Sequence, residues 1–473
     1  MLKEYSKEEL SIMQLVGQTA DQLGLPCYLV GGFVRDKLLG RPCKDMDFVC
    51  IGDAVRLAEE VVRVSGVASN VSIFKNFGTA HLLLNGFDVE FVGARKESYA
   101  AHSRKPEVEA GTLKDDQLRR DFTINAMAVA VNADCFGNFI DPFGGVNDLD
   151  KGIIRTPLSP SQTFSDDPLR MLRAIRFASQ LNFIIHPETW NGILESAQRL
   201  KIISSERIAD ETNKILLSKK PSVGFDLLYK SSLLNAFFPQ FVALSGAEYI
   251  DGKGHKDNFY HTLQVIDNVA VVSDDLWLRW AAVLHDIGKP ATKKFEQGHG
   301  WTFHGHEVVG ARMVPKIFKQ LKLPQNEKMK FVQKLVALHL RPISLTKETI
   351  TDSAIRRLLF DAGDDFDALM MLCEADITSK NQQKVQRFLR NFELVRQRCR
   401  EVEEKDHVRN WQPPITGEII MKTFQLSPCK TVGDLKNAIK DAILDGEVEN
   451  NYEAAYNYLL MKGAELNLAP VGE

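Results

Sequence analysis

The hydrophobic pattern of this chain changes once, close to Pro157. Before that point, short apolar runs such as CYLV at 27–30 and DVEFV at 88–92 alternate with helical segments and glycine turns, which is typical of an α+β domain. After it, apolar residues recur at helical spacing almost to the C-terminus, which predicts an all-α remainder. Because 473 residues exceed one ordinary core, we expect several domains. Breaks in the pattern divide the chain into an α+β domain and three helical domains, at 1–150, 151–245, 246–380 and 381–473.

Composition excludes several classes of protein. No apolar run reaches the roughly 18 residues of a membrane span, and the N-terminal residues lack the apolar segment of a signal peptide, so we expect no membrane association. The seven cysteines include no C-x-x-C pair, which argues against a disulfide framework and favours a cytoplasmic location. The net charge of −3 gives little support for nucleic-acid binding. Two locally basic stretches, at 312–334 and 384–400, are either solvated helix faces or RNA contacts.

A glycine turn followed by a carboxylate pair is the first group of residues that indicates chemistry. Gly31 and Gly32 end a strand, where missing Cβ atoms let the backbone approach a triphosphate, and Arg35 follows one turn into the next helix. Asp45 and Asp47 are two residues apart on an apolar strand, so both carboxylates point to one face.

These carboxylates predict a metal site. Like charges on one face repel each other unless a cation is present, and oxygen ligands favour Mg²⁺ or Mn²⁺ over zinc. Two-metal phosphoryl transfer needs such a pair, because one ion activates a 3′-hydroxyl and the other holds the triphosphate. A third carboxylate is usual, and Glu90 is our candidate, with Asp88 as a rival on the same face.

The run SDDPLRMLRAIRF at 165–177 indicates base recognition. Ser165 or Asp166 is expected to cap a helix. Three charged residues then recur at a spacing of three along one helical face: Asp167, Arg170 and Arg173. The exocyclic amines of cytosine and adenine donate to a carboxylate, and their adjacent ring nitrogens accept from a guanidinium. Uracil and guanine would instead present an acceptor to Asp167, at a cost of about 1–3 kcal/mol for each unpaired group.

The order of these motifs resembles that of the class II tRNA nucleotidyltransferases and bacterial poly(A) polymerases, in the polymerase β superfamily. GGFVRD followed by DMD is similar to their first motif, and RRDFTINAM at 119–127 is similar to their second. The resemblance implies that the second motif holds the triphosphate and ribose of the incoming nucleotide, through Arg120, Asp121 and Asn125. SDDPLR is similar to the E-D-x-x-R motif, with Asp166 in place of the usual Glu.

Further segments extend the resemblance over residues 25–245. The polar segment at 94–118 corresponds to a flexible loop, and DPFGGVNDL at 141–149 to a hinge between head and neck. In SERIADE at 205–211, the resemblance implies that the Arg and the Glu stabilise the helix. The expected fold is a polymerase β-like α+β nucleotidyltransferase head, followed by an all-α neck, an HD domain and a helical tail.

Histidine and aspartate residues in the second half resemble the metal ligands of HD phosphohydrolases. HDIGK at 285–289 follows an apolar helix, and further matches occur at HGHE and EAD. The resemblance implies the ligand set His261, His285, Asp286, His306, His339 and Asp376, with Asp286 able to bridge two ions. Imidazole and carboxylate ligands suit transition metals such as Mn²⁺ or Ni²⁺. His304 is expected outside this set.

The combination of motifs is similar to a subset of bacterial tRNA nucleotidyltransferases that carry an HD domain. It implies addition of CCA to the 3′ end of tRNA from CTP and ATP, with Mg²⁺, and a second, phosphohydrolase activity. Poly(A) polymerase or A-only addition is an alternative, and an HD phosphohydrolase with a non-catalytic RNA-binding head is another. The last ~90 residues are expected to grip the tRNA body or to form a plain helical bundle.

Overall fold

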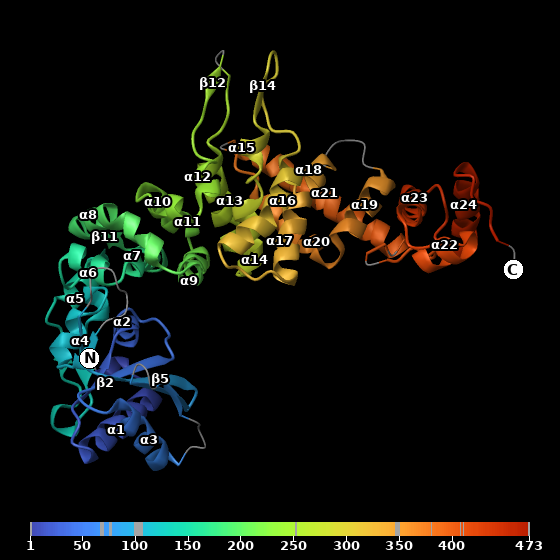
Figure 1. Ribbon diagram of the computed structural model, residues 1–473. Coiled ribbons are helices and arrows are strands. Elements are labelled where there is room, and N and C mark those ends of the chain that lie inside the picture. The colour runs from blue at the N-terminus through green and yellow to red at the C-terminus, as the bar shows by residue number, and fades with distance from the viewer. Residues whose placement is uncertain are drawn as a thin grey trace. The chain divides into compact units, whose positions relative to one another are not determined.

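The computed structural model describes residues 2–66, 71–74, 78–98, 107–250, 253–345, 351–379, 381–406, 408–409 and 411–471. The chain forms two compact units, Met1–Pro239 and Gln240–Glu473, which are treated separately below (Figure 1). The expected class is confirmed: a sheet-containing head is followed by helices. Among the described helices, none is both long and apolar enough to cross a membrane. The finer division into four domains stays a prediction.

The head is built on a seven-stranded mixed sheet in the order β3-β4-β5-β2-β1-β8-β9. β2 and β5 run parallel, and the other neighbours are antiparallel. The sheet core is apolar, with Phe48 stacked on Phe91 at 5.6 Å between ring centroids. The strands are β1 (Cys27–Val30), β2 (Asp45–Cys50), β3 (Ser72–Phe74), β4 (Thr79–Leu84), β5 (Phe87–Gly93), β8 (Ala128–Ala130) and β9 (Phe139–Ile140).

Amphipathic helices pack against this sheet. α1 (Lys7–Gln22) begins in a capping box made by Ser6 and Glu9, and its apolar face packs on α3 (Ala54–Ser65) and β1. α3 in turn packs on β4 and β5. α2 (Gly32–Leu38) leads directly from β1 towards β2 and so holds the glycine turn beside the carboxylates.

The segment at 94–118 is more regular than the predicted loop. β6 (Arg95–Ser98) pairs with β7 (Glu107–Ala110), and α4 (Leu113–Leu118) follows with a capping box at Thr112. Residues 99–106, at the centre of the predicted loop, lie outside the described residues. The prediction of an irregular loop was wrong for residues 95–98 and 107–118. These residues are mostly polar and lack the alternation of apolar and polar residues that would have predicted strands.

The rest of the first unit is helical. Its helices are α5 (Gly145–Asp150), α6 (Pro160–Asp166), α7 (Leu169–Leu181), α8 (Pro187–Ser196), α9 (Ser205–Leu216), α10 (Pro221–Lys230) and α11 (Leu233–Phe237), and α12 (Pro239–Val242) crosses the unit boundary. One short parallel pair, β10 (Ile153–Ile154) with β11 (Ile184–Ile185), interrupts them. α7 packs on α9 and α10, which places its N-terminal end near the head motifs.

The second unit carries most of the remaining helices. They are α13 (Asn258–Val272), α14 (Leu276–Leu284), α15 (Lys289–Thr292), α16 (His306–Gln320), α17 (Glu327–Leu338), α18 (Arg341–Ser344), α19 (Asp352–Ala362), α20 (Phe366–Ala375), α21 (Gln382–Asp406), α22 (Gly417–Phe424), α23 (Lys430–Asp445) and α24 (Tyr452–Glu465). The last three share an apolar cluster that includes Ile420, Ile439 and Leu459.

Two β-hairpins in this unit depart from the predicted all-α pattern. β12 (Tyr249–Ile250) pairs with β13 (Lys253–Gly254), and β14 (Lys294–Glu296) pairs with β15 (Gly300–Thr302). Both project on the same side of the unit (Figure 1). Strands of two or three residues are too short to produce a detectable alternation of apolar and polar residues.

Candidate functional site

The carboxylate pair lies at the centre of the head sheet. In the parallel register of β2 and β5, Asp45 is opposite Asp88 and Asp47 is opposite Glu90. All four side chains therefore share one face of the sheet. The Asp88 carboxylate lies 3.3 Å from His81 Nε2 on β4, whereas Glu90 is exposed and directly beside Asp47.

Electrostatics at Asp47 reflect this crowding. Burial raises the pKa of Asp47 to about 6, the nearby Arg120 opposes the rise, and Glu90 and Asp45 add to it. Because the charged form is disfavoured, a divalent cation bound here would relieve the repulsion between the carboxylates.

Gly31 makes a close approach possible between the turn and two charged groups. Its φ is +78°, in the left-handed region that favours glycine. A Cβ at this position would lie 3.0 Å from Arg120 Nη1 and 3.2 Å from Asp47 Oδ2. The glycine turn therefore forms part of the cavity wall beside the metal-binding candidates.

A chain of hydrogen bonds connects the first motif to the neck. Arg35 Nη1 donates to Asn125 Oδ1 at 2.7 Å, and Asn125 Nδ2 donates to Asp121 Oδ1 at 2.9 Å. Arg173 Nε, on α7, donates to Asp121 Oδ2 at 2.7 Å. Although burial raises the pKa of Asp121, Arg173 and the hydrogen bond from Asn125 hold it at about 2. This carboxylate stays charged and fixes the guanidinium next to the cavity.

The predicted base-reading residues meet partners that the sequence did not reveal. Asp167 Oδ2 forms an ion pair with Arg207 Nη2 on α9 at 2.9 Å. Arg170 Nη2 donates to the Arg119 carbonyl at 2.5 Å. Prediction of Ser165 or Asp166 as the helix cap was wrong: both end α6, and Asp167 Oδ1 accepts from the Leu169 N–H instead.

These groups line one cavity of about 580 Å³ within the first unit. Its wall includes most of the predicted residues, namely Gly31, Gly32, Arg35, Asp45, Asp47, Arg120, Asp121, Asn125, Asp167, Arg170 and Arg173. Glu90 and Asp88 are not part of that wall. The arginines expected to bind phosphate, the carboxylates and the base-reading candidates thus line the same cavity.

Sequence reasoning missed four residues around this cavity. Asp116 is fully buried and pairs with Arg119 and with Arg120, the latter at 2.9 Å. The D-x-x-R-R spacing on one helix was the available signal. Arg207, Arg176 and the Phe177 ring also line the cavity. Arg176 and Phe177 follow Arg173 at helical spacing on α7, which was an available signal, whereas packing of α9 on α7 brings Arg207 there.

The Phe177 ring is a support for three guanidinium groups. Those of Arg35, Arg173 and Arg176 lie 4.9, 5.6 and 4.2 Å from its centroid. Arg176 Nε also lies 2.8 Å from Glu211 Oε2 on α9. Glu211 and Arg207, which were expected to stabilise the helix, thus also contact residues at or beside α7.

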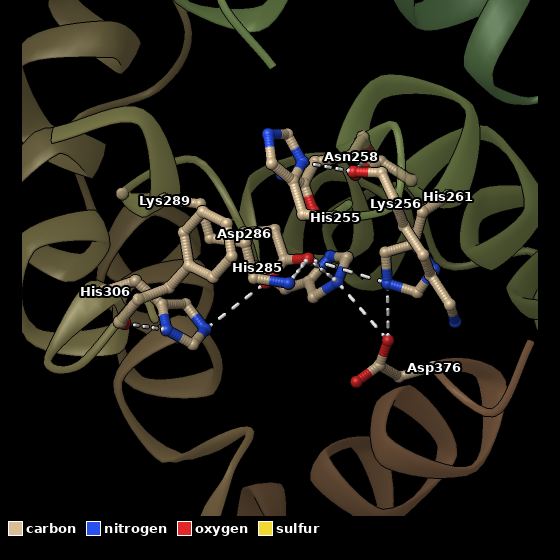
Figure 2. Close-up of polar contacts among 12 residues, drawn as sticks. His255, Lys256, Asn258, His261, His285, Asp286, Lys289, His306 and Asp376 are labelled. Carbon is tan, nitrogen blue, oxygen red and sulfur yellow. Dashed lines mark hydrogen bonds and ion pairs between the residues drawn. The ribbon is translucent and has the colours of Figure 1, made fainter. Parts of the chain in front are cut away.

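In the second unit, imidazoles surround the Asp286 carboxylate (Figure 2). His285 Nε2 and His261 Nε2 lie 3.3 and 3.5 Å from Asp286 Oδ2. His306 Nε2 and His339 Nε2 lie 3.3 and 4.0 Å from Asp286 Oδ1. Each carboxylate oxygen thus faces two rings, as a carboxylate bridging two ions would require.

Backbone carbonyls fix the orientation of three of these rings. The Nδ1 atoms of His285, His306 and His339 lie 2.7, 2.8 and 2.7 Å from the carbonyls of Ala282, Phe303 and Val336. Their buried Nε2 atoms have no hydrogen-bond partner within the described residues. Metal-bound histidines characteristically use one nitrogen this way and coordinate with the other, so the rings fit a divalent ion.

Asp376 and Lys289 complete the surroundings of the centre. Asp376 Oδ1 lies 2.9 Å from His261 Nε2, and Lys289 Nζ lies 2.6 Å from Asp286 Oδ2. Although burial opposes it, Asp286 and Asp376 raise the pKa of His285 to about 10, whereas burial and the neighbouring His285 lower the pKa of His339 to about 4. Two ligand groups satisfy metal-binding spacing, His261–His285–Asp286 and Asp286–His306–His339. His304 is exposed and belongs to neither.

Three family models match the chain in succession. The poly A polymerase head domain matches residues 27–155, the probable RNA and SrmB-binding site of polymerase A matches 182–244, and the HD domain matches 258–378. A polymerase head and an HD domain both imply dependence on divalent metal ions.

Similar proteins support the same assignment. The A-adding tRNA nucleotidyltransferase of Aquifex aeolicus is 45% identical over 200 residues, which are 41% of this chain and 24% of that protein. A solved tRNA nucleotidyltransferase, complexed with a primer tRNA and an incoming ATP analog, is 26% identical with a TM-score of 0.58, over 81% of this chain and 98% of that one. The multifunctional CCA protein of Hahella chejuensis is 34% identical over 366 residues, which cover 74% of this chain and 81% of that protein. Because this relative is matched over 74% of the chain, and family models match both a polymerase head and an HD domain, the chain belongs to the HD-domain-containing multifunctional CCA proteins of the tRNA nucleotidyltransferase family.

Proposed function

We propose that this protein adds CCA to the 3′ end of tRNA from CTP and ATP, without a nucleic-acid template. The observation that carries the proposal is the single cavity lined by the Asp45–Asp47 pair, the glycine turn, Arg120 and the Asp167–Arg170 pair. Relatives named multifunctional CCA protein and a neighbour complexed with a primer tRNA and an ATP analog support this choice of substrates.

Asp45 and Asp47 would hold Mg²⁺, with Glu90 as the third carboxylate. When bound, the ions supply charge neutralisation at the triphosphate and acidify the attacking 3′-hydroxyl. That oxygen forms a bond to the α-phosphorus, the bond to the β-phosphate breaks, and pyrophosphate leaves. Arg120 and Arg35 bind phosphate oxygens at the glycine turn, and Asn125 and Asp121 orient the ribose and the guanidinium groups.

Base choice rests on Asp167 and Arg170, with Arg173 supporting them. Asp167 accepts from the exocyclic amine of cytosine or adenine, and Arg170 donates to the adjacent ring nitrogen. In the structure Asp167 forms an ion pair with Arg207. The incoming base either displaces Arg207 from this carboxylate or binds the carboxylate together with Arg207. Uracil and guanine cannot donate at this position and leave Asp167 unpaired.

The HD centre is proposed to be a phosphohydrolase that holds Mn²⁺, Ni²⁺ or a similar ion. His261, His285, Asp286, His306, His339 and Asp376 would be the ligands. Removal of a 3′-terminal or cyclic phosphate exposes the hydroxyl that the head needs, which gives the two centres a common substrate. A cytoplasmic location accords with seven free cysteines.

Addition of A alone is a second candidate, because the A-adding relative has the higher identity, 45%, although over 200 residues only. The deciding experiment incubates the purified protein with tRNA that lacks CCA and with tRNA that ends in CC, offering CTP, ATP or both. Sequenced products ending in CCA from the first tRNA support CCA addition. Extension of the CC-ending tRNA alone identifies an A-adding enzyme.

The metal carboxylates are tested by substitution. Asp45→Ala and Asp47→Ala each abolish incorporation, and incorporation at the normal rate would refute the assignment. For the third carboxylate, Glu90→Gln lowers incorporation strongly, whereas Asp88→Asn serves as the matched control because Asp88 faces His81. The reverse ranking would assign the role to Asp88.

The HD assignment has its own test. His285→Ala and Asp286→Ala abolish metal-dependent phosphoesterase activity while nucleotide addition continues. His304→Ala is the control, since this exposed histidine lies next to the centre in sequence but outside both ligand groups. Hydrolysis that persists in Asp286→Ala rules out the HD centre as its source.

A further inference from the structure

Two hairpins lie close in the chain to ligand candidates of the HD centre. β12–β13 ends at Gly254, three residues before Asp257, which caps α13. The first turn of α13 carries His261. β14–β15 lies in the chain between Asp286 and His306. Both hairpins project on one side of the unit, and β13 packs against β15 (Figure 1).

An ion pair and an aromatic cluster join the hairpins into one element. Lys293 Nζ, just before β14, lies 2.8 Å from Glu248 Oε1, just before β12. The His255 ring meets the Trp301 and Phe303 rings edge-on, with centroids 5.3 and 5.7 Å apart. The two ribbons are therefore held together by contacts that a single hairpin of this length would lack.

His255 is fixed in one orientation. Its Nδ1 donates to the Lys256 carbonyl at 2.7 Å (Figure 2). Its Nε2 accepts from the Glu248 N–H at 3.3 Å. The hairpin pair thus has a defined geometry relative to the start of α13.

Tyr249 presents an aromatic surface on this element. It pairs with Gly254 across the hairpin, and a Cβ on Gly254 would lie 2.2 Å from the Tyr249 ring. The ring therefore packs directly over the glycine backbone. Its remaining surface is open, since Tyr249 is 74% exposed. An aromatic ring supported on one side and exposed on the other is suited to stack a nucleobase.

Positive charge accompanies this ring. Lys256, two residues beyond Gly254, is exposed and forms no ion pair within the described part of the chain. Proteins bind single-stranded nucleic acid through exposed aromatic rings, which stack bases, and through cations, which bind backbone phosphates, and this hairpin region carries one of each.

We propose that the joined hairpins bind an RNA chain whose phosphate-bearing end lies at the HD centre, with one base stacked on Tyr249 and a backbone phosphate at Lys256. The inference rests on the proposed hydrolase activity and names its substrate class. From Gly254 to His261 the chain spans at most about 16 Å, three extended residues followed by one helical turn. An RNA chain is long enough to contact the hairpin at Gly254 and the HD centre at His261 together, whereas a small phosphodiester is not. The site therefore prefers an oligonucleotide.

The test measures kcat/KM for two substrates with the full-length, metal-loaded protein. One is a short RNA ending in a 2′,3′-cyclic phosphate, and the other is bis(p-nitrophenyl) phosphate, which has no base. The quantity compared is kcat/KM for the RNA divided by kcat/KM for bis(p-nitrophenyl) phosphate. Tyr249→Ala lowers this ratio about tenfold, mainly through KM, as loss of one base–aromatic stack predicts. Lys256→Gln also lowers it, and reduces the dependence of RNA hydrolysis on salt.

Three further variants separate stacking from packing. Tyr249→Phe keeps the ratio of the unaltered protein. Tyr249→Leu still covers Gly254 but has no aromatic ring, so its ratio falls as it does in Tyr249→Ala. Tyr452→Ala is the matched control, because Tyr452 is also an exposed tyrosine of this unit, at 54%. An unchanged ratio in Tyr249→Ala, or the same ratio in the Leu and Phe variants, overturns the inference and leaves the hydrolase assignment intact. Hydrolysis of neither substrate by the unaltered protein overturns both.

Discussion

Gly31 is the residue at which the head site tolerates least change. Gly31→Ala adds a Cβ that meets Arg120 Nη1 at 3.0 Å and Asp47 Oδ2 at 3.2 Å, at a φ of +78°. We expect nucleotide incorporation to fall about tenfold, because Arg120 and Asp47 must shift by a few tenths of an ångström in a site that works by positioning.

Gly40→Ala is the control for backbone strain. Gly40 has a similar φ of +62°, but no described atom lies within 4 Å of the place that a Cβ would take. Thermal unfolding measures the stability that each variant loses, and only Gly31→Ala should lose incorporation. Equal incorporation by the two would mean that the close approach is unimportant.

Asp121 links the stability of the first unit to pH. Its pKa is held at about 2 against an ordinary 3.8, so its charged form stabilises the fold by about 2 kcal/mol. Because the folded-state pKa is depressed, this contribution is complete above the ordinary value and is lost as the pH falls from about 4 to about 2. Asp121→Asn therefore lowers the free energy of unfolding at neutral pH. The difference in this free energy between the variant and the unaltered protein becomes smaller as the pH falls from about 4 to about 2.

Calorimetric unfolding at several pH values measures this difference. Asp210→Asn is the control, since Asp210 is exposed and its pair with Lys214 contributes little. A difference for Asp121→Asn that does not change with pH would exclude the carboxylate charge as the cause.

At the scale of elements, α9 acts on base choice through Arg207. Arg207→Ala removes the ion pair at Asp167 and leaves that carboxylate held by the Leu169 N–H. We expect discrimination between CTP and UTP to fall about tenfold, because a less constrained carboxylate positions its hydrogen bond less well. Incorporation of each nucleotide offered singly measures the ratio.

Lys214→Ala is the matched control on the same helix. Lys214 pairs with Asp210 one turn away, at 2.6 Å, and that pair lies outside the cavity wall. Both variants remove one cation from α9, so a loss of discrimination in both would indicate a general charge effect. Loss in Arg207→Ala alone assigns the effect to Asp167.

At the scale of the whole molecule, each compact unit carries its own metal-binding candidates. An ion that binds only the folded HD centre stabilises the second unit, by about 2.7 kcal/mol when its concentration is 100 times the Kd. Adding Mn²⁺ or Ni²⁺ to metal-stripped protein should therefore raise one unfolding transition in calorimetry. Asp286→Ala should remove that shift and Asp45→Ala should keep it; a shift that survives Asp286→Ala would place the binding elsewhere.

Local spacing determined much of this protein from its sequence. Asp45 and Asp47 share a face because a strand repeats every two residues, and the switch to helical periodicity near Pro157 separated head from neck. The resemblance to HD phosphohydrolases likewise indicated a metal centre at His285 and Asp286, and the structure gathers the partners proposed for it. These features depend on neighbours in the chain and on residue type.

Only the tertiary structure decided which distant groups meet. The parallel register of β2 and β5 places Glu90 beside Asp47. The Asp88 carboxylate instead lies 3.3 Å from His81 on the neighbouring strand β4. Packing of α9 on α7 brings Arg207 to Asp167, and the folding of separate helices divides four histidines between the two oxygens of Asp286. The physical reason is that periodicity fixes the face on which a side chain lies, whereas its partner depends on how whole elements pack.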